Sequence, residues 1–190
     1  PVQVVIVPIP KPAPEIDEAA EKIMQALREK GISVQYDRDD RKRPGFKFAE
    51  HEMRGVPVRL GLGKRDLAKD QVEVARRDTK EKSFQPLDGI AEHVQQLLED
   101  IQQNLFRRAK EYRDSHITEV NDFEEFKELL NSKGGFLSAH WDGTTETEIR
   151  IKELTKATIR CIPLDAREEE GKCILTGKPS KQRVLFAKAY

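Results

Sequence analysis

Apolar and polar residues follow patterns that predict an α/β organisation for the first half of the chain. Val2–Ile9 is an almost continuous apolar run bounded by prolines, which is typical of a strand buried on both faces of a sheet. Apolar residues then recur at helical spacing from Ile16 to Leu27, between an early proline and Gly31. Ile32–Tyr36 alternates like a short strand. This β-α-β order predicts a pair of parallel strands.

The same patterns extend the predicted sheet and lead into a long helix. Phe48–Arg54 fits a short helix, whereas Val56–Leu62 and Gln71–Arg76 fit strands. Pro86 and Asp88 then precede a stretch in which apolar residues keep one helical face through several turns. The residues of that face are Ile90, Val94, Leu97, Leu98, Ile101, Leu105, Ala109 and Tyr112. We therefore predict one α/β domain over residues 1–110, with a mixed sheet flanked by helices and the start of a long connecting helix.

Residues 111–190 predict a second, small α+β domain. Asn121 and Glu124 form a capping-box pattern before a helix that Gly134 and Gly135 end. Short apolar runs predict strands at Phe136–Ala139, Thr158–Ile162 and Arg183–Ala187. The sequence shows no internal repeat and no low-complexity tract.

The composition describes a densely charged chain without overall charge. The 34 Lys and Arg residues balance 34 Asp and Glu residues, so only a local cluster can supply the positive field that a nucleic acid needs. No apolar run reaches the roughly 20 residues of a membrane-spanning helix, and the 2 cysteines are too few for a disulfide scaffold. We therefore expect a cytoplasmic protein with no membrane partner. The start at Pro1, without methionine, is typical of a piece of a longer protein or of a processed terminus.

No motif of a catalytic centre is recognisable. The sequence has neither a phosphate-binding glycine loop of the Walker type nor a serine nucleophile elbow. Gly61 and Gly63 lack the third glycine of a dinucleotide-binding turn, so a strand end with a tight turn is favoured over a small nucleotide-binding protein. The 4 histidines are scattered, and His93 falls beside the apolar face of the long helix, as a packing residue would.

A mixed-charge segment with interleaved aromatic residues is the strongest candidate for a binding function. Arginine and lysine contact phosphates, and aromatic rings stack on unpaired bases. Glu52 or Asp66 can accept hydrogen bonds from the edge of a guanine. The alternative is an ordinary solvated surface, which the residue chemistry alone favours. The segment carries Arg38, Arg41, Lys42, Arg43, Phe46, Lys47, Phe48, Arg54, Arg59, Lys64 and Arg65.

Three segments resemble prolyl-tRNA synthetases of the archaeal/eukaryotic-like type: Arg43–Asp66 (RPGFKFAEHEMRGVPVRLGLGKRD), Arg160–Asp165 (RCIPLD) and Gly177–Tyr190 (GKPSKQRVLFAKAY). The resemblance covers essentially the whole chain. It implies a class II anticodon-binding domain, followed by the small α+β zinc-binding-like domain of that family. It also implies a catalytic domain upstream of Pro1, with the ATP, proline and magnesium sites, so the chain itself is expected to bind tRNA(Pro) without catalysing. The family dimerises largely through the catalytic domain, which leaves a monomer open for this piece.

The resemblance also assigns candidate RNA-contacting residues. The prolyl anticodon has two invariant guanines, and the family positions that read base edges fall on Glu52 and Arg59. Phe48 is implied as a stacking or wall residue, and Arg65 as a residue near the anticodon. The flanking candidates are Arg43, Lys47 and Asp66. A stand-alone nucleic-acid-binding relative of such a domain remains the alternative.

The C-terminal domain has lost most of the metal ligands that the resemblance implies. Four cysteines bind zinc in the family, and their positions fall here on Asp142, Thr147, Cys173 and Thr176. We therefore predict no zinc, and expect packing to hold the domain together, with Cys161 as a buried core thiol. The expected core residues are Phe136, Ile149, Ile159, Cys161, Leu185 and Phe186. The resemblance further implies that the Tyr190 carboxylate helps to organise the active site of the intact enzyme.

Overall fold

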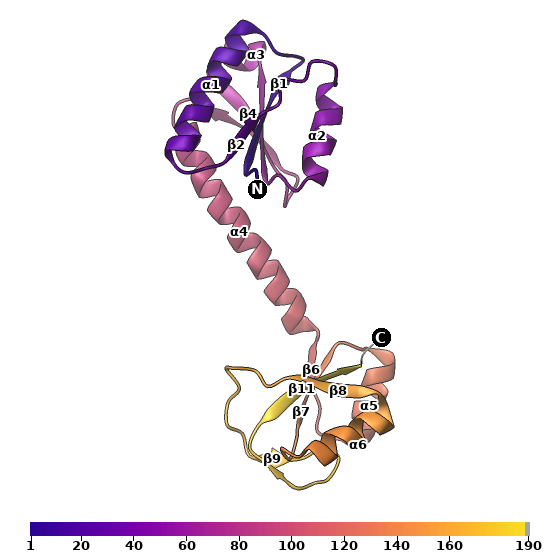
Figure 1. Cartoon of the computed structure of the whole chain (residues 1–190). Helices are drawn as coiled ribbons and strands as arrows, with labels where there is room; N and C mark the ends of the chain where they lie inside the picture. The colour runs from indigo at the N-terminus through magenta and orange to yellow at the C-terminus, as the bar shows by residue number, and fades with distance from the viewer. Residues whose placement is uncertain (189–190) are drawn as a thin grey trace. The chain divides into compact units, whose positions relative to one another are not determined.

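The computed structural model describes residues 1–188, which form two compact units divided after Arg108 (Figure 1). The first unit contains a five-stranded sheet in the order β2-β1-β3-β4-β5. β2 (Val34–Tyr36), β1 (Val4–Ile9) and β3 (Val58–Gly63) are parallel, whereas β4 (Gln71–Arg76) and β5 (Lys82–Pro86) are antiparallel additions. The predicted mixed sheet and its parallel first pair are confirmed.

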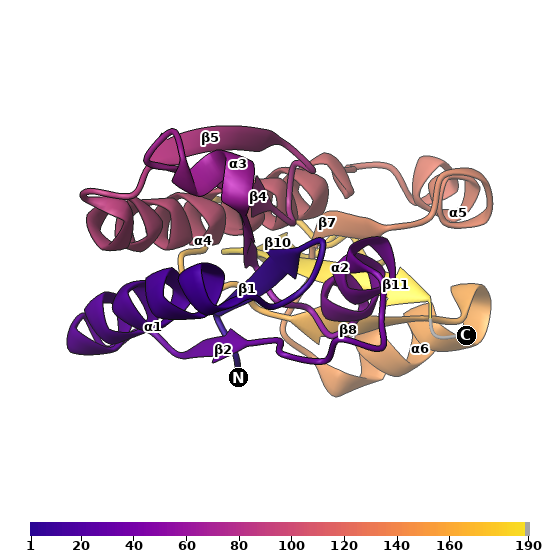
Figure 2. The ribbon, with the colours of Figure 1, turned by 90° about the horizontal axis from the view of Figure 1, so that it is seen from above.

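Alternation along the strands sends two sets of side chains to the two faces of this sheet. One face packs its apolar residues against α1 (Pro14–Glu29) and the first part of α4 (Ile90–Ser115). The other face packs against α2 (Pro44–Met53), and Figures 1 and 2 show α1 and α2 on opposite sides of β1. The single-turn helix α3 (Lys64–Leu67) follows β3 directly. The sheet is thus covered on both faces, as the apolar character of β1 predicts.

The second unit, from Ala109 onward, is a four-stranded sheet with two helices and a short hairpin. Its strand order is β6-β7-β11-β8, and its core includes Phe126, Leu137, Ile151 and Phe186. This arrangement confirms the α+β expectation. Its elements are β6 (Ile117–Glu119), α5 (Phe123–Ser132), β7 (Phe136–His140), α6 (Thr145–Thr155), β8 (Ala157–Cys161), β9 (Gly171–Lys172), β10 (Pro179–Ser180) and β11 (Arg183–Lys188).

Several details differ from the sequence-based expectations. The cap of α5 is Asp122, whose side chain accepts a hydrogen bond from Glu125 N at 2.9 Å, so the predicted cap at Asn121 was one residue early. Ile149 and Cys161 were wrongly predicted to be buried and are exposed. α6, which buries Ile151 two residues after Ile149, was not predicted, because its first turn is dominated by Thr and Glu. α3, β5, β6, β9 and β10 were also not predicted.

The exposed Leu105 and Tyr112 continue the apolar face of α4 beyond Ile101, which is its last buried residue. No helix within residues 1–188 is long and apolar enough to cross a membrane. The predicted role of Tyr190 lies outside the described residues.

Candidate nucleic-acid interface

The α2 side of the first sheet positions the residues that the sequence singled out. In β3, Val58, Leu60 and Leu62 belong to the core on the α1 side, so Arg59 between them points to the α2 side. Phe48 lies in α2 and packs against the small apolar cluster of Val5 and Val7 of β1. Because residues four apart share one face of a helix, Glu52 lies one turn beyond Phe48 on that face. Strand alternation and helical spacing therefore bring Phe48, Glu52 and Arg59 together.

Arg59 is buried, with only 6% of its surface exposed, and is held from two sides. Its Nη1 donates to Glu73 Oε1 at 2.8 Å, and its guanidinium carbon lies 3.6 Å from the centroid of the Phe48 ring. Arg59 pairs with Ala75 in the β3–β4 register, so Glu73 is its diagonal neighbour on the same face. Phe48 is thus a wall that orients Arg59, and Glu73 is a site residue that the sequence reading missed.

Glu52 is exposed at the rim of this site and is tied to the turn between β4 and β5. Its Oε2 accepts from Lys80 Nζ at 2.9 Å, and its backbone oxygen accepts from Arg77 Nε at 2.8 Å. The hydrogen bond from Lys80 lowers the pKa of the Glu52 carboxyl below its usual range. Lys82 of β5 lies 6.0 Å from the Phe48 ring centroid. These three cations of the β4–β5 hairpin were not predicted, because only tertiary structure brings them to α2.

Asp78 anchors that hairpin turn. Its carboxylate accepts from Arg76 Nε and Nη2, each at 2.8 Å, and from Asn104 of α4 at 2.6 Å. The hydrogen bond from Arg76 holds the pKa of Asp78 far below its usual range. The turn that presents Arg77 and Lys80 is therefore fixed to the body of the first unit.

Lys47, one of the predicted flanking candidates, is buried in the structure. Only 2% of its surface is exposed, and its Nζ donates to the backbone oxygen of Asp37 at 2.9 Å. The Asp37 carboxylate contacts Lys47 Nζ at 3.2 Å and His51 Nε2 at 2.9 Å. Burial raises the pKa of Asp37, but the hydrogen bonds from His51, the backbone N–H of Asp39 and Lys47 together outweigh it and leave that pKa below its usual value. Lys47 thus fastens α2 to the loop after β2.

A cavity of about 20 Å³ lies between α2 and the β3–β4 strands, lined by Phe48, His51, Glu52, Arg59 and Arg77, among others. This volume holds about one water molecule. His51 Nδ1 is the one fully buried side-chain nitrogen or oxygen without a hydrogen-bond partner in the part of the chain that the structure describes.

Arg43, Arg65 and Asp66 lie at the other end of the same elements. Arg43 precedes the first turn of α2, and the exposed Arg65 lies in α3 beyond the end of β3. Four residues of strand separate Arg59 from Gly63, a distance of roughly 13 Å. The seven candidate residues therefore divide into three sets. They are the pocket residues Phe48, Glu52 and Arg59, the buried Lys47, and the distal residues Arg43, Arg65 and Asp66.

Much of the basic run neutralises itself. Arg38 pairs with Glu21, and Lys42 and Arg54 both pair with Glu50. The glycines of RLGLGKRD offer no phosphate cradle, since Gly61 is buried in β3, where an added Cβ would lie 3.3 Å from Glu73 Oε1 and 3.4 Å from Arg59 Nη1. Two further cations of the basic run are paired with carboxylates: Arg41 with Asp39, and Lys64 with Glu15.

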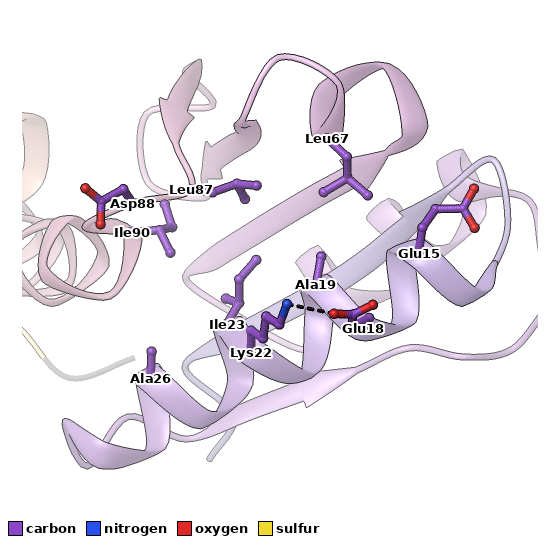
Figure 3. Close-up of a pocket in the computed structure, with 10 residues that line it drawn as sticks. All are labelled: Glu15, Glu18, Ala19, Lys22, Ile23, Ala26, Leu67, Leu87, Asp88 and Ile90. Atoms are coloured by element: carbon purple, nitrogen blue, oxygen red, sulfur yellow. Dashed lines mark hydrogen bonds and ion pairs between the residues drawn. The ribbon is translucent and has the colours of Figure 1, made fainter.

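A separate hollow of about 450 Å³ lies on the opposite side of the first unit, along α1 (Figure 3). Ala19, Ile23 and Leu67 contribute its apolar lining, and Lys22 pairs with Glu18 at 2.7 Å across its edge. Among the described residues, no aromatic side chain lines this hollow and its one cation is paired, so the hollow lacks the features that recognise RNA.

Hydrogen bonds join three of the four positions implied as zinc ligands in the second unit. Asp142 Oδ2 accepts from Thr147 Oγ1 at 2.8 Å and from Thr176 Oγ1 at 2.9 Å. Cys173 is buried in the same hairpin as Thr176. No group of three or more His, Cys, Asp or Glu side chains within residues 1–188 is arranged to hold a metal ion.

Comparison with known proteins matches both units to described families. Residues 3–97 match the anticodon binding domain family, and residues 123–190 match the prolyl-tRNA synthetase C-terminal family. The whole chain is 59% identical to part of a proline–tRNA ligase of Phocaeicola vulgatus and 59% identical to part of one of Porphyromonas gingivalis. It spans 39% of the length of each of these relatives.

A solved structure supports the same assignment. The chain superposes over its whole length on 41% of the prolyl-tRNA synthetase of Cryptosporidium parvum, a structure in complex with L-proline and AMP. The TM-score is 0.93 and the sequence identity is 32%. The chain therefore belongs to the prolyl-tRNA synthetase family, in which it corresponds to the anticodon-binding domain and the C-terminal domain.

Proposed function

We propose that the pocket formed by Phe48, Glu52 and Arg59 reads unpaired bases of the tRNA(Pro) anticodon. The observation that supports this proposal is the position of Arg59, whose guanidinium carbon lies 3.6 Å from the centroid of the Phe48 ring. The exposed Glu52 lies one helical turn beyond Phe48 in α2. A fixed guanidinium and an ionised carboxylate offer donors and an acceptor at one place. This pair is complementary to guanine, whose O6 and N7 accept and whose N1–H and N2–H₂ donate.

The division of the candidate residues suggests different roles for them. Arg77, Lys80 and Lys82 surround the pocket and supply positive charge for the phosphates beside a bound base. Arg43, Arg65 and Asp66 are placed to contact nucleotides or backbone further along the loop. Lys47 takes part indirectly, since its buried ammonium holds the start of α2 in place.

We further propose that the intact protein is a cytoplasmic proline–tRNA ligase of the archaeal/eukaryotic-like type. Such an enzyme activates proline with ATP and magnesium, transfers it to tRNA(Pro) and functions as a homodimer. The names of the relatives and the similarity to the Cryptosporidium parvum enzyme support this proposal. In it, the present chain contributes recognition and positioning of the tRNA.

Binding of a short RNA tests the pocket directly. An anticodon stem–loop with two adjacent guanines is titrated against the chain, and the same hairpin with two adenines provides the specificity control. We expect weak, salt-sensitive binding that Glu52→Gln and Arg59→Ala reduce and that favours the guanine hairpin. Arg28→Ala and Glu146→Gln, at exposed positions on α1 and α6, are the matched controls. Equal binding of both hairpins, unchanged by the pocket substitutions, would refute the proposal.

A further inference from the structure

His51 has a buried ring nitrogen for which the rest of the first unit provides no partner. Its Nε2 lies 2.9 Å from Asp37 Oδ2, so in the tautomer whose Nε2–H donates to that carboxylate, Nδ1 carries a lone pair. The two ring nitrogens point away from each other, and Nδ1 remains without a hydrogen bond. Buried acceptors are rarely left unsatisfied in proteins, which indicates that something outside the described atoms donates to this one.

The adjoining cavity limits what that donor can be. His51 lines the cavity of about 20 Å³, which is large enough for one water molecule. Its lining also includes Glu52, Arg59 and Arg77, so a water there has the two to four polar partners that it needs.

We propose that one water molecule in this cavity donates to His51 Nδ1 and connects His51 to Glu52 and Arg59 for RNA binding. This inference rests on the proposed function and adds a positioning residue to it. His51 then acts from both ring nitrogens: Nε2 fastens α2 to Asp37, and Nδ1 fixes the water that orients the base-reading groups. Water-mediated contacts of this kind contribute to recognition nearly as well as direct ones.

Two substitutions of His51 test the roles of its two ring nitrogens separately. Gln places its amide near the position of Nε2, so His51→Gln keeps a donor toward Asp37 and removes the acceptor at Nδ1. Asn places its side-chain oxygen near Nδ1, so His51→Asn keeps that acceptor and loses the contact with Asp37. We expect His51→Gln to weaken binding of the guanine stem–loop about 3- to 10-fold with little loss of thermal stability. We expect His51→Asn to lower the melting temperature but to keep most of the affinity.

The outcomes distinguish this inference from the proposed function. Native affinity in His51→Gln, together with loss of binding in Glu52→Gln, would overturn the role of Nδ1 and leave the pocket standing. Unchanged binding in Glu52→Gln and Arg59→Ala would instead remove the pocket itself. A Nδ1 nitrogen chemical shift typical of a hydrogen-bonded acceptor, in the folded chain without RNA, would support the water.

A second inference concerns the metal site that the family resemblance implies, and the side chains here do not fit zinc. Zinc in structural sites takes four thiolate or imidazole ligands, and neutral hydroxyls are poor ligands. The implied positions offer one thiol, one carboxylate and two threonine hydroxyls, at Cys173, Asp142, Thr147 and Thr176.

Hydrogen bonds join the same segments that a metal would join. Asp142 follows β7, Thr144 caps α6, Thr147 lies in the first turn of α6, and Thr176 lies in the turn between β9 and β10. Asp142 Oδ1 lies 3.2 Å from Thr144 N and 2.9 Å from Thr144 Oγ1, while Oδ2 accepts from Thr147 and Thr176. One carboxylate thus links three segments of the chain.

We propose that the Asp142 carboxylate replaces zinc as the cross-link of the C-terminal domain. A carboxylate with several hydroxyl and amide donors is a strong hydrogen-bonded centre, because charge-assisted hydrogen bonds are about twice as strong as neutral ones. The domain then keeps the geometry of a metal site without needing a metal.

Restoring the thiols tests this inference. The combined variant Asp142→Cys, Thr147→Cys and Thr176→Cys places three thiols beside Cys173. We expect it to bind one zinc ion per chain when refolded with zinc and to lose thermal stability when EDTA is added. The native chain should bind no stoichiometric zinc and should be insensitive to EDTA. Stoichiometric zinc in the native chain, or a folded triple variant that binds none, would contradict the proposal.

A single substitution provides a check that does not depend on metal. Thr147→Val removes one hydroxyl that donates to Asp142 and keeps the side-chain shape. We expect the melting temperature to fall by about 5–10 °C. Thr145→Val, on the exposed side of the same helical turn, is the matched control and should change it little. Equal melting temperatures for the two variants would show that the carboxylate centre does not hold the domain.

Discussion

The guanidinium carbon of Arg59 lies 3.6 Å from the centroid of the Phe48 ring, and Glu73 Oε1 receives a hydrogen bond from the same guanidinium at 2.8 Å. A flat cation between an aromatic ring and a carboxylate has little freedom to turn. The guanidinium is therefore held in one orientation in the free chain, and in the proposed function this preorganisation lowers the entropy that RNA binding has to overcome.

Removing Arg59 should affect stability as well as recognition. Arg59→Ala leaves Glu73 without its partner on a largely buried face, so we expect the free energy of unfolding to fall by about 2–4 kcal/mol. The double variant Arg59→Ala with Glu73→Ala should lose less than the sum of the single losses, because each partner's cost depends on the other. Urea denaturation of the four proteins measures this coupling, and strict additivity would mean that the pair is not energetically linked.

Gly61 leaves the space that the Arg59–Glu73 pair occupies. An added Cβ would lie 3.0 Å from Ile9 Cδ1, 3.3 Å from Glu73 Oε1 and 3.4 Å from Arg59 Nη1. In Gly61→Ala, we expect the added methyl group to push back the Ile9 side chain and the Glu73 carboxylate, and through Glu73 to shift the guanidinium. RNA binding should weaken by about 10-fold, an effect of roughly 1.4 kcal/mol. Gly45→Ala is the matched control, since nothing lies within 4 Å of its added Cβ. If the two variants bound RNA alike, displacement of Arg59 would be excluded.

Substitutions of Lys47 and Arg43 should distinguish a residue that stabilises the fold from a residue that contacts RNA. Lys47→Met leaves the partly buried Asp37 carboxylate without one of its three partners, the others being His51 and the backbone N–H of Asp39. We therefore expect a loss of about 2–3 kcal/mol in unfolding free energy. Arg43→Ala changes an exposed residue and should leave stability within about 0.5 kcal/mol. It should nevertheless weaken RNA binding and reduce the salt dependence by about one phosphate contact. Chemical denaturation and binding at several salt concentrations measure the two effects.

The C-terminal domain should become less stable in acid through Asp142. Burial raises the pKa of Asp142, but the hydrogen bonds from Thr147, Thr144 and Thr176 outweigh it and hold that pKa below its usual value. Because the folded pKa is the lower one, the ionised carboxylate stabilises the fold above the ordinary value of about 3.9. That stabilisation is lost as pH falls through the folded pKa.

Melting temperature measured against pH tests this expectation. Nearby elements carry Glu146, Glu148, Lys172 and Lys178, and no described residue forms an ion pair with Asp142. Asp142→Asn should therefore lower stability at neutral pH and flatten the decline below about pH 4. A decline as steep as that of the native chain would assign the acid sensitivity to other carboxyl groups.

Sequence patterns alone were sufficient for the main elements of this protein. The apolar run of β1, the alternation of β4 and the periodic faces of α1 and α4 reflect burial, which acts on every residue of an element at once. A resemblance in Arg43–Asp66 was sufficient to mark Phe48, Glu52 and Arg59 as a group, and helical and strand periodicity places these three on one face. Helical and strand periodicities are readable in the sequence because they arise from the local geometry of the backbone.

Only the tertiary structure decided which charged side chains are buried in ion pairs and which are exposed. Lys47, Arg43 and Arg65 look alike in the sequence, yet the structure buries Lys47 against Asp37 and leaves the other two exposed. Glu73 and Lys80 reach the pocket across a strand pairing and a turn, and Thr176 reaches Asp142 across 34 positions. Hydrogen bonds and ion pairs act over a few ångströms in space, so their partners depend on which distant segments the fold brings together.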